Sequence, residues 1–463
     1  MLVTSQDKTI HCLGIGGAGV GAIAELLLRQ GYKVSGSDVS SSKLLNHLVQ
    51  IGAKVYPEHN ASNIENADIV VYSTAITDDN PELKAAYEKK LEVCHRAEML
   101  ARIMKPFKKI TVAGTHGKTT TSSMMANLLL AAGIDPSFAI GGWVQATQSN
   151  SYLGKGEWFV AEADESDASF LYLESDIAIV TNIDEDHMQT YDHDVQKLLI
   201  AFEKFLNKLL PNGLAVLCID DDNIKTIIPH LKNNIITYGQ TDLADWQLTH
   251  FVQEGMTSYF AIKRKNLPTL RVSLQMPGVH NALNAIATAI VAHELGLSDE
   301  QITVGLTAFA GVGRRFQMHG EVTVEGGMAL ILEDYGHHPR EVAAIISAVR
   351  ACWPDRRLFM IFQPHRYSRT RDLFHEFVDV LQKVDVLFLT PVYAATEPPI
   401  EGADSAAIAT ALLGKGQSSV LVQSLENLHL MIKEQLCAGD IVIFQGAGNI
   451  GHYAKSLVLW ESS

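Results

Sequence analysis

The chain has 463 residues, 47% of them hydrophobic and 19% charged, which predicts a globular protein of about three domains with buried cores. Its formal net charge of −15 and the lack of any Lys- or Arg-rich block exclude the basic surface on which nucleic-acid binding depends. Five scattered cysteines without a C-x-x-C pair predict free thiols in a reducing compartment. The sequence has neither a signal-peptide pattern nor an apolar run of about 18 residues, so we expect a cytoplasmic protein without a membrane partner.

An apolar run followed by glycines opens the chain. Residues 10–21 read IHCLGIGGAGVG, and the spacing Gly14-x-Gly16-x-x-Gly19 is typical of a strand and turn that receive the pyrophosphate of a dinucleotide. Asp38 follows about 20 residues later, where a nucleotide ribose is commonly bound. Taken alone, the pattern leaves open an NAD-dependent dehydrogenase.

The rest of the first block alternates short apolar runs with helical patterns. Strand-like segments at 32–38 and 67–75 and a capped helix at 78–90 predict a parallel, Rossmann-like sheet. The basic segment 102–109, which contains Pro106, is expected to be a linker. We therefore place a first domain at 1–106.

A glycine-rich loop follows the next apolar strand. Residues 109–123 read KITVAGTHGKTTTSS, and a helical pattern begins at once. In such a loop backbone N–H groups approach phosphates, Lys118 reaches the outer phosphates and Thr119 binds Mg²⁺. The loop departs from the standard G-x-x-x-x-G-K-[ST] form because Val112 stands at the first glycine position, and the alternative is a glycine turn that binds nothing.

Acidic residues end two further strand-like runs, EWFVAEADESD at 157–167 and DIAIVTNIDEDHM at 176–188. Next to a phosphate loop, they predict a Mg²⁺–nucleotide site, because Mg²⁺ prefers oxygen ligands and substrate phosphates. Glu162 and His187 are the favoured metal ligands, whereas the sequence does not decide whether Asp164 and Asp186 bind the metal. Without the loop, both clusters would be solvated acidic loops.

The remaining pattern divides the chain once more. Antiparallel-looking segments lie at 251–265 and 270–278, and a helix is expected from Asn281, whose side chain suits capping, to Leu295, before Gly296. We place the central domain at 107–312 and a third at 313–463. The third carries apolar runs at 328–336, 357–365, 384–392 and 440–448, each leading into a polar or glycine-rich loop where ligands of open α/β sheets collect.

Several of these motifs, taken together and in order, resemble the Mur ligase family over essentially the whole chain. They are GTHGKTT, AEADESD, TNIDEDH, HNALNA, GRRF, DYGHHP and QPHRYSRT. The resemblance implies a three-domain α/β ligase that binds a UDP-sugar in the N-terminal domain, ATP and Mg²⁺ in the central domain and an amino acid in the C-terminal domain. It is strongest to members that join L-alanine to the lactoyl carboxylate of UDP-N-acetylmuramate through an acyl phosphate, for peptidoglycan precursors.

The resemblance also implies roles for individual residues. For ATP they are Gly114, Thr115, His116, Gly117, Lys118, Thr119, Thr120, His280, Asn284, Arg315 and Asp334. For the UDP-sugar they are Gly16, Gly17, Ala18, Gly19, Asp38, Ser73, Thr74 and Arg96. For the amino acid they are Tyr335, His337, His365, Arg366 and Arg369, for the metal Thr119, Glu162 and His187, and for catalysis Lys118, His187, Arg315 and His337.

Some of these residues also allow interpretations other than ligand binding. Adjacent arginines such as Arg314 and Arg315 are usually solvated, and the pair His337 and His338 is a poor zinc site because neighbouring histidines point apart. Val279, Gly313 and Asn449 depart from the family pattern. A non-catalytic nucleotide-binding regulator and a ligase that attaches a recycled peptide are the remaining alternatives. The number of Mg²⁺ ions stays open, and we expect a monomer or weak homodimer.

Overall fold

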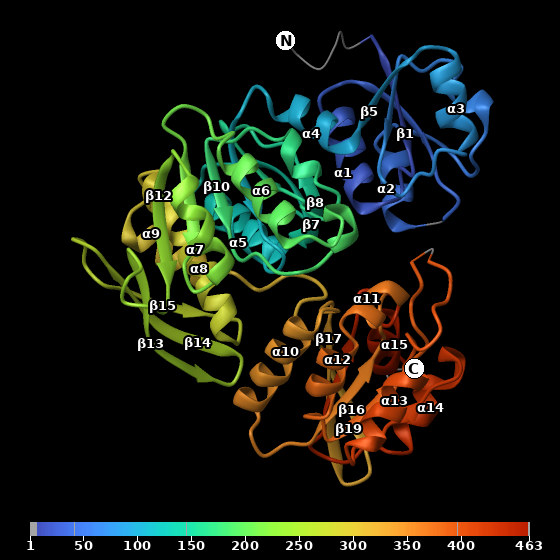
Figure 1. Cartoon of the computed structure of the whole chain (residues 1–463), viewed down its shortest axis with the longest axis vertical. Coiled ribbons are helices and arrows are strands. Elements are labelled where there is room, and N and C mark those ends of the chain that lie inside the picture. Colours follow the sequence, from blue (N-terminus) through green and yellow to red (C-terminus); the bar gives the residue numbers. More distant parts are fainter. Residues whose placement is uncertain (1–6, 41, 145, 396, 462–463) are drawn as a thin grey trace. The chain divides into compact units, whose positions relative to one another are not determined.

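The computed structural model describes residues 7–40, 42–144, 146–395 and 397–461. They form two compact units: the first runs up to His250 and adds Phe260–Val272 and Leu283–Phe309, and the second comprises Phe251–Tyr259, Ser273–Ala282 and the chain from Ala310 onward. Three sheets, each with its own helices, give the expected three-domain α/β organisation (Figure 1). All five cysteines are free thiols, as predicted.

The N-terminal sheet is parallel, as expected, and has the strand order β3-β2-β1-β4-β5. Its strands are β1 Thr9–Leu13, β2 Lys33–Ser37, β3 Lys54–Tyr56, β4 Ile69–Tyr72 and β5 Glu92–His95. Its helices are α1 Ala18–Arg29, α2 Lys43–Gln50, α3 Pro81–Glu88 and α4 Arg96–Met104, with a 3₁₀ turn at Ala61–Ile64. The order places β1, which leads into the glycine turn, at the centre of the sheet, where β2 and β4 flank it.

Local signals set these helix ends. The predicted helix cap at α3 is confirmed, because the Asn80 side chain accepts hydrogen bonds from Glu82 N and Leu83 N and proline occupies the first turn. The expected linker at 102–109 is too long: α4 continues to Met104 and the next strand begins at Lys108. The helix persists because its apolar positions, among them Ile103 and Met104, are fully buried.

A buried carboxylate, Glu82, ties the N-terminal domain together. It accepts hydrogen bonds from side chains of β1, β2 and the segment after β3, namely His11, Ser37, His59 and Asn63. Burial alone would raise the pKa of Glu82, but these hydrogen bonds lower it to about 2. The ionised Glu82 of α3 therefore links β1, β2 and the segment after β3.

Replacement of Glu82 by glutamine is expected to destabilise the protein in a pH-dependent way. The folded-state pKa lies below the unfolded one, so this carboxylate contributes stability above about pH 4.5 that is lost as the pH falls toward 2, and its full contribution is about 3 kcal/mol. Urea unfolding of wild type and Glu82→Gln between pH 7 and pH 3 measures it. A difference in unfolding free energy that stays constant over this range would contradict the assignment.

The central sheet has ten strands in the order β15-β14-β13-β12-β11-β10-β6-β9-β7-β8. The strands are β6 Lys108–Ala113, β7 Ser137–Val144, β8 Ser149–Tyr152, β9 Trp158–Glu162, β10 Ile177–Val180, β11 Leu214–Cys218, β12 Asn234–Gly239, β13 Trp246–Glu254, β14 Thr257–Arg264 and β15 Leu270–Leu274. The pairs of β6 with β9 and β10 are parallel, whereas β7 and β8 are antiparallel. Because β6 lies between β9 and β10, the carboxyl ends of all three strands meet at one edge.

The helices of this domain are α5 Lys118–Ala131, α6 Val195–Leu206, α7 Asp222–Ile227, α8 Val279–Glu294 and α9 Asp299–Thr307. Short 3₁₀ turns lie at Ser169–Tyr172, Met188–Tyr191 and Ile228–His230. Helix α5 packs on β6, β7, β9 and α9. The expected cap at Asn281 is wrong, because α8 begins at Val279 and the Asn281 amide inside its first turn donates to Pro277 O at 2.8 Å.

The C-terminal sheet has the order β16-β17-β21-β18-β19-β20, in which β16 pairs antiparallel with β17 and the other pairs are parallel. Its strands are β16 Gln317–Val324, β17 Gly327–Asp334, β18 Leu358–Phe362, β19 Val386–Leu389, β20 Val420–Leu421 and β21 Ile441–Gln445. Its helices are α10 Pro339–Cys352, α11 Tyr367–Asp372, α12 Phe374–Leu381, α13 Ser405–Gly414, α14 Leu428–Lys433 and α15 Gly451–Glu461, with a 3₁₀ turn at Leu425–Asn427.

Side chains on alternate positions of this sheet enter two separate cores. Leu358, Met360 and Phe362 of β18 pack with residues of α10, α12 and α13, whereas Phe359 and Ile361 pack with residues of α14 and α15. Both faces are thus covered by helices, which leaves the strand ends as the place for polar loops. In the described ranges, none of the helices combines the length and apolar character needed to cross a bilayer.

Candidate functional site

The glycine-rich loop joins β6 to α5 with the geometry of an anion cradle. Gly117 is the residue before α5 and adopts a φ of 86°, in the left-handed region that favours glycine. Gly114 has a φ of 124°, and a Cβ there would collide with the Thr181 hydroxyl. A 14-residue helix therefore begins directly after Gly117, and the backbone N–H groups of its first turn point toward the loop.

The strand end at β10 holds this loop in place. Asn182 Oδ1 accepts from His116 N at 2.8 Å, and Asn182 Nδ2 donates to His116 O at 2.9 Å. The His116 ring lies 3.0 Å from an Asp184 oxygen. Asn182 was not among the predicted site residues, although it belongs to the TNIDEDH motif, because its role is to bind the loop backbone.

Lys118 is held between the loop and a buried carboxylate. Its Nζ donates to Gly114 O at 2.6 Å and to the two Glu165 oxygens at 2.8 and 2.7 Å. Burial disfavours the charged lysine, but Glu165 and then Asp164 raise the pKa of Lys118 above its ordinary value. Burial raises the pKa of Glu165, which is 2% exposed, to about 7. The pair keeps a charged ammonium directly at the loop.

Two predicted metal ligands lie together beside this lysine. Thr119 Oγ1 donates to Glu162 Oε2 at 3.2 Å, and Glu162 Oε1 accepts from Gly141 N at 2.7 Å. Burial raises the pKa of Glu162. A hydroxyl and a buried carboxylate at the mouth of a phosphate cradle are the donor set that Mg²⁺ takes, so these residues fit the ion. His187 follows β10 with a φ of 55°, and its ring is 3.6 Å from the Asp186 carboxylate.

Predicted ATP-binding residues occur in both compact units. In the first, Asn284 of α8 faces the loop, since a Cβ on Gly117 would lie 3.0 Å from Asn284 Oδ1, and Thr120 is buried in α5. His280, Arg315 and Asp334 belong to the second unit.

The predicted UDP-sugar residues gather around the first glycine turn. Gly17 precedes α1, and Asp38 Oδ2 accepts from Gly16 N at 2.8 Å. Arg96 also lies beside the turn, since a Cβ on Gly19 would be 3.6 Å from Arg96 Cδ and 3.7 Å from Nη1. Asp38 thus supports the backbone of the turn itself, a role that its sequence spacing did not predict.

Two more predicted sugar contacts follow β4. Ser73 O accepts from Ile76 N, and Thr74 Oγ1 lies 3.4 Å from Asp167 of the central domain. These residues lie on the loop after a strand adjacent to β1, at the same edge as the glycine turn.

Four aromatic rings form a cluster at the end of the C-terminal sheet. Tyr335 and His337 lie 5.5 Å apart, His337 and His365 lie 5.4 Å apart, and His365 stacks on Tyr393 at 5.5 Å. Arg369 Nη1 donates to His365 O at 3.2 Å. Tyr393 was missed because its loop after β19 carries no motif; the bridge that pairs it with His365 appears only in the folded sheet.

One arginine near this cluster, Arg366, lies beside a carboxylate. Arg366 has a φ of 71°, its guanidinium lies 3.9 Å from Glu397, and the same carboxylate accepts from Ser368 N and Oγ. Glu397 was also missed, since an isolated acid before two prolines has no sequence signature.

The GRRF arginines flank one ring. The guanidinium carbons of Arg314 and Arg315 lie 4.8 and 4.9 Å from the Tyr335 ring centre. Arg314 Nε also donates to Glu333 at 2.6 Å, whereas Arg315 lies 3.6 Å from Glu341. Arg314 is thereby fixed within the domain.

Asp334 accepts hydrogen bonds from Phe316 N, Gly336 N and Gln445, and burial raises its pKa. Its carboxylate shapes the turn after β17.

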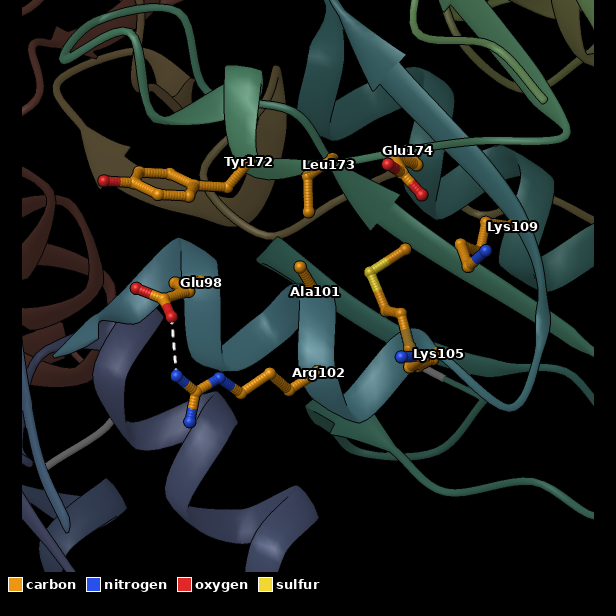
Figure 2. Close-up of a pocket in the computed structure, with 9 residues that line it drawn as sticks. Glu98, Ala101, Arg102, Lys105, Lys109, Tyr172, Leu173 and Glu174 are labelled. Carbon is orange, nitrogen blue, oxygen red and sulfur yellow. Dashed lines mark hydrogen bonds and ion pairs between the residues drawn. The ribbon is translucent and has the colours of Figure 1, made fainter. Parts of the chain in front are cut away.

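A cavity of about 250 Å³ lies apart from these residues, between α4 and the segment 172–174 (Figure 2). It is lined by Glu98, Ala101, Arg102, Met104, Lys105, Lys109, Tyr172, Leu173 and Glu174. None of them is a predicted site residue, and the lining contains three cations and two carboxylates, of which Arg102 and Glu98 form an ion pair.

Three family models match the chain in succession. The model described as Mur ligase family, catalytic domain, matches residues 9–108, the Mur ligase middle domain matches 112–292, and the Mur ligase, glutamate ligase domain, matches 314–448.

Solved structures resemble the chain over nearly its full length. The UDP-N-acetylmuramate-alanine ligase MurC from Thermotoga maritima shares 26% identity at a TM-score of 0.84, with 98% of this chain and 99% of that chain covered. A murein peptide ligase from Psychrobacter arcticus shares 23% identity at 0.73, covering 98% of each. MurF from Thermotoga maritima in complex with ADP shares 16% at 0.62, covering 93% and 94%. At identities of 23% and 16%, the likeness to the murein peptide ligase and to MurF establishes a shared fold alone.

Proposed function

The chain belongs to the Mur ligase family of ATP-dependent ligases, and on that premise we propose that it joins L-alanine to the lactoyl carboxylate of UDP-N-acetylmuramate, releasing ADP and phosphate, in the synthesis of peptidoglycan precursors. The ligase chemistry rests on Lys118, which is held charged at the end of a phosphate cradle. The choice of alanine rests on the full-length likeness to the Thermotoga maritima alanine ligase.

The first step is phosphoryl transfer from ATP to the carboxylate. A carboxylate is a poor electrophile, and phosphorylation converts one of its oxygens into a leaving group. The loop N–H groups and Lys118 hold the outer phosphates and stabilise the charge that develops during transfer. Thr119 and Glu162, with His187 as a third candidate, would hold Mg²⁺, which neutralises phosphate charge when bound.

The second step is attack by the amine of alanine on the acyl phosphate. The amine must be neutral, so a base is needed, and His337 and His365 of the aromatic cluster are the candidates. Arg366 or Arg369 would bind the α-carboxylate, because a guanidinium matches a carboxylate with two parallel hydrogen bonds. Arg315 is the proposed further contact to the transferred phosphoryl group.

A ligase that attaches a peptide is the second candidate, because the murein peptide ligase of Psychrobacter arcticus shares the fold over the whole chain. Phosphate release from ATP and Mg²⁺ in the presence of UDP-N-acetylmuramate, with alanine, glycine, serine or tripeptide in parallel, distinguishes the two. We expect release to depend on alanine. Release that is faster with tripeptide would replace the alanine proposal, and release with neither would overturn it.

A further inference from the structure

One arginine lies between the proposed sugar-nucleotide turn and the ATP-site loop. Arg96 begins α4, directly after β5. Its side chain passes beside Gly19, where a Cβ would lie 3.6 Å from Arg96 Cδ and 3.7 Å from Nη1, and its Nη2 donates to Asp164 Oδ2 at 2.8 Å. One arginine side chain thus lies beside the turn of the N-terminal domain and bonds through Nη2 to a carboxylate of the central domain.

The carboxylate that receives Arg96 is itself firmly oriented. Asp164 Oδ1 accepts from Ser166 N at 3.1 Å, and Asp164 O accepts from Phe170 N at 3.0 Å. These two hydrogen bonds hold the Asp164 carboxyl group in a fixed position, where it can accept from Arg96.

A second carboxylate of the same loop supports this arrangement. Asp167 lies 3.5 Å from Arg96 Nη2, 3.6 Å from His95 Nε2 and 3.4 Å from Thr74 Oγ1. The His95 ring also stacks on Tyr172 at 5.9 Å. Residues 164–167 therefore fix both the position of Arg96 and the loop after β4.

Since an arginine side chain loses considerable conformational freedom when it binds an anion, a partner that holds it in place beforehand increases affinity. We propose that Asp164, on the ATP-site loop, is a positioning residue for sugar-nucleotide binding: it holds Arg96 so that the free N–H groups of the guanidinium meet the diphosphate on the turn at 16–19. This inference rests on the proposed function. The sugar-nucleotide site is then complete only when the central domain contributes Asp164.

The test is calorimetric binding of UDP-N-acetylmuramate to the full-length chain without ATP or Mg²⁺, so that Asp164 acts on the sugar-nucleotide site alone. We expect Asp164→Asn to raise Kd about 10-fold and Arg96→Gln to raise it at least as much. The double variant should bind no more weakly than Arg96→Gln, because Asp164 acts only through Arg96. Thermal unfolding confirms that each variant is folded.

Arg102→Gln is the matched control. Arg102 lies on the same helix and pairs with Glu98 (Figure 2). It also pairs with Glu92 and not with the central loop, so the Kd of Arg102→Gln should equal that of the wild type. A Kd of Asp164→Asn within two-fold of wild type, or losses that multiply in the double variant, would overturn the inference alone. Absence of binding by the wild type would overturn the proposed function and the inference with it.

Discussion

Lys118→Ala is expected to lower turnover by about 1,000-fold or more, because it removes the charge that stabilises the phosphoryl group in transfer. The Kd for UDP-N-acetylmuramate should stay within about three-fold of wild type, since the glycine turn and Lys118 belong to different sheets. Phosphate release measures the first quantity and calorimetry the second. Residual activity above one tenth of wild type would contradict the role of Lys118.

The variant has a structural consequence that needs its own control. Without Lys118, the buried Glu165 loses the ammonium that donates to both of its oxygens, and a buried polar group that loses its hydrogen-bond partner destabilises the fold. The double variant Lys118→Ala/Glu165→Gln should regain thermal stability but not turnover. Lys197→Ala removes an exposed lysine of the same domain, paired with Asp192, and should change neither.

The phosphate loop was predictable because its information is local. A strand, a glycine-rich loop and a helix follow one another within residues 108–131, and each is encoded by its own residues. The acidic strand ends were also predictable in outline, because in a parallel sheet the ends of neighbouring strands meet. The order β10-β6-β9 brings Glu162 within hydrogen-bonding distance of Thr119, as that reasoning requires.

The partners of these residues were not predictable, because they depend on the direction of side chains far apart in the sequence. Glu165 lies 47 residues from Lys118, and its neighbours Asp164 and Asp167 point to the N-terminal domain instead. The segment AEADESD contains four acidic residues, and nothing in the sequence distinguishes their roles. Only the turn after β9 directs Glu162 to Thr119, Glu165 to Lys118 and the two aspartates to the N-terminal domain.

Asp38 is another residue whose contact could not be predicted from the sequence. Its spacing from the glycine turn predicts a nucleotide contact, yet in the structure it accepts a hydrogen bond from Gly16 N. Strands β1 and β2 are adjacent, so the residue that follows β2 lies next to the glycine turn whether it binds a ligand or the protein backbone. Sequence spacing therefore locates the residue but does not distinguish a ligand contact from support of the backbone.

Glu162→Gln is expected to raise the Mg²⁺ concentration for half-maximal turnover and to lower kcat by about 100-fold, because it replaces an anionic ligand by a neutral one of the same shape. The glutamine oxygen can still accept from Gly141 N, and its amide nitrogen can donate to Thr119 Oγ1, so the fold around α5 should persist. Mg²⁺ titrations of phosphate release at saturating ATP measure both effects.

The control for this variant stands on the same chain segment. Glu157→Gln changes an exposed glutamate just before β9 that pairs only with the surface residue Lys108 among the contacts described, and should leave the Mg²⁺ dependence unchanged. An equal response of the two variants would mean that Glu162 acts through packing rather than charge. A selective response of Glu162→Gln would instead support Glu162 as a residue that holds the ion together with Thr119.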